Sequence, residues 1–474
     1  MTMPASFDNS YSRLPASLHA SVRPTPVAEP ALIEVNLPLA LELGLDPALF
    51  TAEVAVGNRL LPGTAPIAQA YAGHQFGHFV PQLGDGRAIL LGEVVDRNGI
   101  RRDIQLKGAG PTPFSRRGDG RAALGPVLRE YLVSEAMHAL GIPSTRALAA
   151  ATTGEKVYRE AALPGAVLTR VAKSHIRVGT FQYFAARRDR DSLSVLVDHV
   201  IARHYPAAAT SDNRALALLD SVMLAQARLV ARWAGIGFIH GVMNTDNMSV
   251  SGETIDYGPC AFMDRYDPAT VFSSIDEYGR YAYANQPAIA QWNLARFAET
   301  LIPFLDPDRE AAIAVATQRI EAFPALFTDQ WTDVFRAKIG LASAEDADAD
   351  LIHALLDAMH GAGADFTLTF RRLSLGEAVP ELDAWLGQWR TRLQRDRQSN
   401  DQQLALMRAS NPAYIPRNHL VEAMIEAAVE RADPEPFRTM LQVLLSPYSE
   451  QEGMDRYAAA PAETGQAYRT FCGT

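Results

Sequence analysis

The stretch Phe238-Ile-His-Gly-Val-Met-Asn-Thr-Asp-Asn247, with Asp256-Tyr-Gly258 downstream of it, carries the strongest indication of the fold. An amphipathic pattern over residues 214–234 predicts a long helix that ends just before the first of these motifs. Short apolar runs at 248–250 and 254–255 predict two small strands between the motifs. The glycine of the second motif allows a turn that points Asp256 into a cleft.

Upstream of these motifs, the pattern changes to strands around a single helix. Asn98-Gly99 predicts a hairpin between two strands, and Thr153-Gly154 is expected to join two more. Gly125-Pro126 opens a helix between the two pairs, because proline suits the first helical turn. The four expected strands lie at residues 87–95, 102–107, 146–152 and 157–162.

Three chemical features follow one another in the order that is typical of kinase-type phosphotransferases. Lys107 ends a predicted strand and is followed by a helix with carboxylates, so it can neutralise phosphate charge. His240 is then followed by Asn247, and Asp256 opens an Asp-aromatic-Gly triplet. Asn247 and Asp256 offer the hard oxygen ligands that Mg²⁺ prefers. Each feature alone is more often a solvated lysine or a plain turn, but their order predicts an ATP and magnesium site.

Two departures from the kinase pattern concern the chemistry. Val242 stands where a kinase has its catalytic aspartate, and a carboxylate occurs instead at Asp246, beside Asn247. Either the chain does not catalyse phosphotransfer, or Asp246 serves a different in-line geometry. The usual glycine-rich loop is also absent, and Leu83-Gly-Asp-Gly-Arg87 takes its place, where two glycines still allow the backbone to approach a phosphate.

Basic residues gather in the part of the chain where an anion would bind. Arg170 lies in the apolar, strand-like run Leu168-Thr-Arg-Val-Ala172, and a buried arginine requires an anionic partner. For Arg116, Arg117 and Arg121, a solvated charged face explains the sequence equally well. The complete set is Arg87, Lys107, Arg116, Arg117, Arg121, Arg170 and Arg177.

Composition narrows the class of protein. The chain has 474 residues, of which 48% are hydrophobic and 21% charged, as is ordinary for a globular protein with a large core. A net charge of -10 disfavours nucleic acid and anionic membranes as partners. The two cysteines, the lack of a spanning apolar run and the absence of a signal-peptide pattern predict a cytoplasmic protein.

Several longer motifs resemble the selenoprotein O family, the protein adenylyltransferases with a pseudokinase fold. They span most of the chain in the order expected for that family. The motifs are Tyr71-Ala-Gly-His-Gln-Phe-Gly77, Leu83-Gly-Asp-Gly-Arg87, Gln105-Leu-Lys-Gly108, Thr112-Pro-Phe-Ser-Arg116, Asp119-Gly-Arg121, Arg129-Glu-Tyr-Leu-Val-Ser-Glu-Ala136, His240-Gly-Val-Met-Asn-Thr-Asp-Asn247, Asp256-Tyr-Gly-Pro259 and Asn411-Pro-Ala-Tyr-Ile-Pro-Arg417.

The resemblance implies a reaction as well as a fold. In this family ATP is inverted relative to kinases, so that its α-phosphate faces the acceptor and diphosphate leaves. Asp246 would be the base, Asn247 and Asp256 would bind Mg²⁺ or Mn²⁺, and the missing base at Val242 would then be accounted for. By similarity the nucleotide would be bound by Gly84, Gly86, Arg87, Lys107, Asp119, Gly120, Arg170, Arg177 and Asp256.

Two further expectations follow from the resemblance. The family motif makes Glu130 the carboxylate partner of Lys107, although the helical spacing alone places Glu135 nearer the centre of the apolar stripe. Family members are redox-regulated through a C-terminal cysteine, so the resemblance raises a reversible disulfide between Cys260 and Cys472. The alternative is two unrelated thiols.

The sequence as a whole predicts an α+β, protein-kinase-like two-lobe fold. We expect an N-terminal extension at 1–65, a nucleotide-binding lobe at 66–180, a lobe with the catalytic and metal loops at 181–285, a helical region at 286–445 and a mobile tail at 446–474. The predicted function is transfer of AMP, and potentially UMP, to hydroxyls of Ser, Thr or Tyr on proteins, including the enzyme itself. A kinase with a displaced base and a non-catalytic ATP-binding pseudokinase are the alternatives.

Overall fold

A large antiparallel sheet forms the N-terminal half of the protein. The computed structural model describes residues 6–462 and 468–471. Within them the eight-stranded sheet has the order β1-β3-β6-β7-β10-β9-β2, with β8 beside β10. The strands are β1 (His19–Ser21), β2 (Ala31–Val35), β3 (Ile67–Gln69), β6 (Ala88–Val95), β7 (Arg101–Lys107), β8 (Ala122–Ala123), β9 (Arg146–Tyr158) and β10 (Ala162–Ala172).

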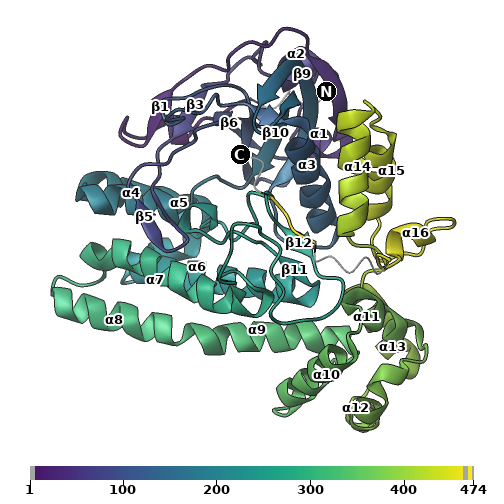
Figure 1. Cartoon of the computed structure of the whole chain (residues 1–474). Coiled ribbons are helices and arrows are strands. Elements are labelled where there is room, and N and C mark those ends of the chain that lie inside the picture. The colour runs from purple at the N-terminus through teal and green to yellow at the C-terminus, as the bar shows by residue number, and fades with distance from the viewer. Residues whose placement is uncertain (1–5, 463–467, 472–474) are drawn as a thin grey trace.

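Helices form most of the remainder, and they lie below and beside the sheet in Figure 1. The long helix predicted before the first motif is present as α6 (Arg214–Gly235). The other helices are α1 (Leu37–Glu42), α2 (Ala52–Ala55), α3 (Leu124–Ala139), α4 (Val178–Arg187), α5 (Arg190–His204), α7 (Gln286–Leu305), α8 (Arg309–Glu321), α9 (Phe323–Lys338), α10 (Asp348–Ala362), α11 (Phe366–Leu375), α12 (Asp383–Arg395), α13 (Asn400–Ser410), α14 (Asn418–Glu430), α15 (Glu435–Leu444) and α16 (Asp455–Ala458).

The mixed α/β composition, with an antiparallel sheet and a helical C-terminal region, is confirmed. The hairpin β6–β7 turns at Asn98-Gly99, and α3 begins next to Gly125-Pro126, as predicted. The N-terminal segment forms part of the sheet, because β1 and β2 lie at its opposite edges.

The prediction that Thr153-Gly154 joins two strands is wrong. Strand β9 continues through both residues to Tyr158, and the chain reverses at residues 159–161 instead. Gly154 has a φ of 73°, and a Cβ atom there would lie 2.5 Å from the Cβ of Glu29. This glycine therefore permits close approach of the N-terminal segment to the sheet and does not make a turn.

The two small strands predicted at 248–250 and 254–255 do not pair with each other. Ser249 forms an isolated bridge with Arg177, and Thr254 forms one with Ser144. Both runs are short, and each finds its backbone partner in a segment from the other half of the chain. In this part of the chain, the strands that pair are β11 (Phe238–Ile239), which opens the first motif, and β12 (Ala261–Phe262), which follows the second.

Helix α3 is covered on two sides. Its apolar residues share one core with residues of the sheet, such as Ala147 and Leu168, and with residues of α14 and α15, such as Met424 and Phe437. Figure 1 shows α14 and α15 standing beside α3, although they come from the end of the chain. The helix that carries Glu130 is therefore fixed by both ends of the sequence.

The helical half buries one lysine. Lys338 of α9 donates from Nζ to Oδ1 of Asn411 at 2.7 Å, and its Nζ lies 4.0 Å from the ring centre of Phe370. Burial disfavours the ammonium form and lowers the pKa of Lys338 to about 7.

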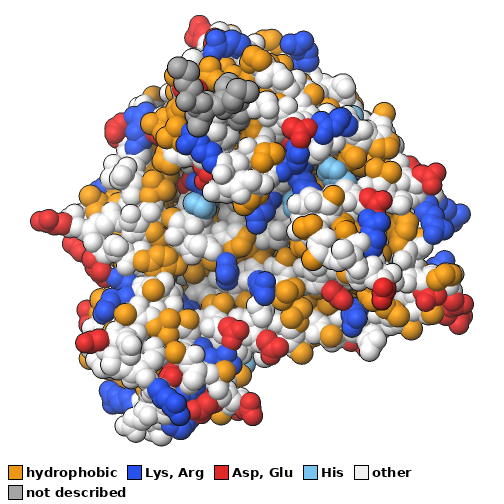
Figure 2. Space-filling view, turned by 180° about the vertical axis from the view of Figure 1, so that it is seen from behind, with side chains coloured by type: hydrophobic (Ala, Val, Ile, Leu, Met, Phe, Trp, Pro, Cys, Tyr) orange, Lys and Arg blue, Asp and Glu red, His pale blue; other side chains and the backbone are white. Residues whose placement is uncertain are grey.

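The surface carries both signs of charge. Figure 2 shows acidic and basic side chains intermixed with hydrophobic ones across one face of the molecule. Among the described residues, none of the helices is both long enough and apolar enough to cross a membrane.

Candidate active site

A cavity of about 510 Å³ lies between the sheet and the loops that follow α6. Its walls bring together eight of the predicted site residues from distant parts of the sequence. They are Gly84, Gly86, Arg87, Asp119, Gly120, Asp246, Asn247 and Asp256. Lys107 lines a small adjoining pocket with Arg87, Glu130 and Asp256. Arg170 and Arg177 are buried and lie outside these two linings.

Lys107 connects α3 to the Asp-Tyr-Gly triplet. Its Nζ donates to Oε2 of Glu130 at 2.5 Å and to Oδ1 of Asp256 at 2.6 Å. Glu135 points elsewhere and accepts from the guanidinium of Arg146 and the backbone N–H of Ala147. Of the two carboxylates considered for Lys107, the one in contact with it is thus Glu130.

The backbone of Asp256 has an unusual conformation. Its φ of 68° lies in the left-handed region, which non-glycine residues adopt rarely. Burial alone would raise the pKa of this carboxyl group, but the positive charges of Lys107 and Arg87 outweigh burial and lower it. Asp256 is therefore an anion at the edge of the cavity.

Asp246 belongs to the short helix η4 (Thr245–Asn247) and is buried against the hairpin of β4 (Gly73–Gln75) and β5 (His78–Val80). Burial raises the pKa of its carboxyl group to about 6. The side chain of Gln75 donates to its Oδ2 at 3.5 Å, whereas its Oδ1 has no hydrogen-bond partner. A buried carboxylate with a free oxygen and a raised pKa is suited to accept a proton.

The hairpin β4–β5 holds the loop of Asp246 through its backbone. The N–H of His74 donates to Oγ1 of Thr245 at 2.7 Å, and the N–H of Phe76 donates to Oδ1 of Asn244 at 3.0 Å. A Cβ atom at Gly73 would lie 2.4 Å from Oδ1 of Asp246. The place of Asp246 therefore requires glycine at position 73.

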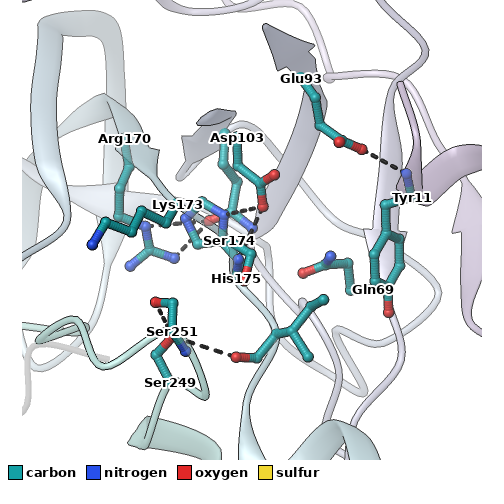
Figure 3. Close-up of polar contacts among 12 residues, drawn as sticks. Tyr11, Gln69, Glu93, Asp103, Arg170, Lys173, Ser174, His175, Ser249 and Ser251 are labelled. Carbon is teal, nitrogen blue, oxygen red and sulfur yellow. Dashed lines mark hydrogen bonds and ion pairs between the residues drawn. The ribbon is translucent and has the colours of Figure 1, made fainter. Parts of the chain in front are cut away.

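Arg177 is placed by the segment that precedes α4. His175, two residues earlier, donates from its backbone N–H to Oδ2 of Asp103 at 2.9 Å, and its Nδ1 lies 2.9 Å from the same oxygen (Figure 3). Burial lowers the pKa of His175 to about 4, so the ring is neutral. The guanidinium of Arg177 then lies 4.3 Å from the ring centre of Tyr71.

Asp119 and Gly120 lie at the outer rim of the cavity. Asp119 is half-exposed and forms an ion pair with Arg159 at 2.9 Å. Gly120 has a φ of 67°, and a Cβ atom there would lie 2.1 Å from the carbonyl carbon of Gly110. The glycine thus allows two backbone segments to pass each other at the rim.

Cys260 is buried, and burial raises the pKa of its thiol to about 12. The C-terminal segment reaches this region, because Oγ1 of Thr470 donates to the carbonyl of Pro259 at 2.6 Å. Cys472 lies outside the described residues, so the disulfide between the two cysteines stays a prediction.

Oxygen donors for a divalent cation are available in the cavity. Nδ2 of Asn247 donates to the carbonyl of Val242 at 3.1 Å, which leaves the amide oxygen as the atom for a cation. Asp256 provides the charged partner. Among the described residues, no group of three His, Cys, Asp or Glu side chains could hold a metal. These donors fit Mg²⁺, which takes few protein ligands and completes its shell with water and phosphate oxygens.

Four residues of the site were not singled out from the sequence. Gly73 and Gln75 contact Asp246, Tyr71 stacks on Arg177, and Asp85 lies near Arg177. All four fall within motifs that carry the family resemblance, so that resemblance was the available signal. Their roles depend on contacts across the fold, which spacing does not reveal.

This chain is similar to known proteins over nearly its whole length. The sequence model of the family described as "Protein adenylyltransferase SelO" matches residues 2–445. The protein nucleotidyltransferase YdiU of Rhizobium rhizogenes is 61% identical, with 99% of this chain and 97% of that protein aligned. The protein of the same name from Methylorubrum populi is 60% identical over 100% of both chains. The chain therefore belongs to the protein adenylyltransferase SelO family and is a nucleotidyltransferase.

Proposed function

We propose that this enzyme transfers AMP from ATP to hydroxyl groups of Ser, Thr or Tyr on proteins, including itself, and releases diphosphate. The observation that carries the proposal is the position of Asp246. It is the carboxylate that lines the cavity beside Asn247, whereas the place of a kinase base is taken by the buried Val242. The family to which the chain belongs supports the same reaction.

Each group of residues in the site has its own role in the proposed reaction. Asp246 accepts the proton of the acceptor hydroxyl, because a buried carboxylate with a pKa near 6 can take a proton at neutral pH. Lys107 and the arginines bind the phosphates and offset the charge of the leaving diphosphate. Asn247 and Asp256 would hold Mg²⁺ or Mn²⁺, which would supply further charge compensation.

The two halves of the molecule support a kinase-like arrangement as part of this proposal. The strand lysine Lys107, the helix glutamate Glu130 and the triplet at Asp256 meet as they do in that fold class. The nucleotide-binding lobe would be residues 66–180 and the catalytic lobe 181–285. The extension 1–65, the helical region 286–445 and the tail 446–474 complete the proposed division, and a cytoplasmic location remains a prediction.

Labelled ATP tests the reaction directly. The enzyme is incubated with Mg²⁺ and a protein acceptor, with α-labelled and γ-labelled ATP in parallel tubes. Label on protein from the α-position only, with diphosphate release and an AMP-sized mass increase, is the expected result. Label from the γ-position only would establish a kinase, and no label with intact ATP binding would establish a pseudokinase. A parallel tube with α-labelled UTP tests UMP transfer.

A further inference from the structure

Asp85 is part of a buried polar network behind the nucleotide cavity. The residue is 1% exposed and stands between the two glycines that line the cavity. Its Oδ2 accepts from the backbone N–H of Gln69 at 3.1 Å and from Nε2 of Gln105 at 3.3 Å. Its Oδ1 lies 3.7 Å from Nη2 of Arg177 and has no hydrogen-bond partner.

Gln105 extends the network from Asp85 to the second buried arginine. Its Oε1 accepts from Nε of Arg170 at 3.2 Å and from Nη2 at 2.6 Å. Arginine has no acceptor atom and an ionised carboxylate has no donor, so the amide of Gln105 fits between them in this orientation only. Gln105 is fully buried on β7, and its side chain is therefore fixed by its two partners.

From Arg170 the network continues to the cavity. Nη1 of Arg170 donates to Oε1 of Glu130 at 3.0 Å, and the other oxygen of Glu130 accepts from Lys107. Three cations alternate with three carboxylates and one amide along the whole path, which runs Arg177, Asp85, Gln105, Arg170, Glu130, Lys107 and Asp256. The cations are therefore paired and oriented before any phosphate arrives.

Asp85 also ties its own loop to the sheet. Its backbone N–H donates to the carbonyl of Gln69 at 2.9 Å, and its carbonyl accepts from Oγ1 of Thr112 at 2.6 Å. The backbone between Gly84 and Gly86, which faces the cavity, is thus fixed by the residue that contacts Arg177. One carboxylate connects the glycine loop with the arginines.

We propose that Asp85 is a positioning residue, which holds Arg177 directly and Arg170 through Gln105 in the orientation that binds the phosphates of the nucleotide. This role depends on the proposed function in one respect, which is that the bound nucleotide is ATP. Buried partners of this kind order the groups that touch a ligand, so that less conformational freedom is lost on binding.

A double-mutant cycle on ATP affinity tests the proposal, because residues that act through one another are not additive. Calorimetry with Mg²⁺ and ATP, without acceptor, measures the dissociation constant. We expect Asp85→Asn, which keeps the shape and removes the charge, to weaken binding about tenfold. In an Arg177→Gln background, the same change should weaken binding by clearly less than tenfold, because only its effect through Gln105 and Arg170 remains. The proposal would be overturned if the losses of affinity in the two single variants multiplied in full in the double variant. Wild-type affinity in Arg177→Gln would overturn it as well.

A second double-mutant cycle tests the same network in case the Asp85→Asn variant does not fold. Gln105→Met removes the three hydrogen bonds to Asp85 and Arg170 at similar side-chain size, and it is compared alone and in an Arg170→Gln background. The same non-additivity is expected, and independent effects would overturn the role of Gln105. Asp96→Asn is the matched control, because Asp96 is a buried carboxylate that pairs with Arg102 at 2.9 Å in the β6–β7 turn. Its affinity for ATP should equal that of the wild type.

The cycles are independent of the transfer reaction. If the wild type binds ATP but transfers no AMP, the proposed function fails while the cycles still decide the role of Asp85. If AMP transfer is observed but the cycles are additive, the positioning role alone is wrong.

Discussion

Replacing Gly73 by alanine adds one carbon atom next to the proposed base. The new Cβ would lie 2.4 Å from Oδ1 of Asp246 and 2.9 Å from its Cγ. A carbon–oxygen contact needs about 3.4 Å, so the carboxylate must move by about 1 Å. A displacement of that size at a reacting group costs about a hundredfold in rate. We expect Gly73→Ala to lower AMP transfer by about a hundredfold.

The affinity for ATP should change little in this variant, because in the proposed mechanism Asp246 takes part in proton transfer and other residues bind the phosphates. Transfer is measured with α-labelled ATP at saturating acceptor, and affinity by calorimetry. Gly361→Ala is the control, since a Cβ atom at Gly361 in α10 would meet no other atom within 4 Å. Wild-type transfer by a folded Gly73→Ala enzyme would refute the reasoning, as would an equal loss of ATP affinity.

Three further outcomes are expected. In the folded protein the pKa of Lys338 is lowered from 10.5 to about 7. Between these two pH values the unfolded chain therefore carries a proton on this lysine that the folded chain lacks. The free energy of unfolding should thus rise with pH across that range, by up to about 1.4 kcal/mol per pH unit. Lys338→Met should lack this rise in denaturant unfolding at pH 7 to 10, and parallel pH profiles of the two proteins would contradict it. Asp256→Ala, or chelation of the divalent cation, should abolish transfer while circular dichroism stays unchanged, and near-normal activity would show that the metal site is misassigned. If Cys260 and Cys472 form a reversible disulfide, reductant should change activity in the wild type and not in Cys472→Ser; peptide mapping after mild oxidation that finds no linked pair would leave two unrelated thiols.

Local chemistry made much of the fold predictable. The hairpin at Asn98-Gly99, the start of α3 and the long helix α6 follow from turn residues and periodicity, which act over a few residues. The turn predicted at Gly154 was wrong because this glycine instead allows close contact with Glu29, which is far away in the sequence. The runs at 248–250 and 254–255 were misread for the same reason, since their partners are Arg177 and Ser144.

In the candidate site too, local patterns could be predicted and contacts between distant residues could not. Lys107, Asn247 and Asp256 could be predicted because their order along the chain is a chemical pattern. The contact of Lys107 with Glu130 in place of Glu135 depends on which face of α3 meets the sheet, and Arg146 takes up the other carboxylate. Spacing along one helix does not contain that information.

The cover that α14 and α15 provide over α3 bears on synthesis of the protein. A nascent chain emerges from the ribosome N-terminus first, so the sheet and α3 are complete long before residues 418–444 appear. Until then the face of α3 with Val127 and Tyr131 has no partner from those helices, because the side chains that bury it, such as Phe437, are still to be made. The growing chain therefore presents an apolar surface for much of translation, which is the kind of surface that chaperones bind.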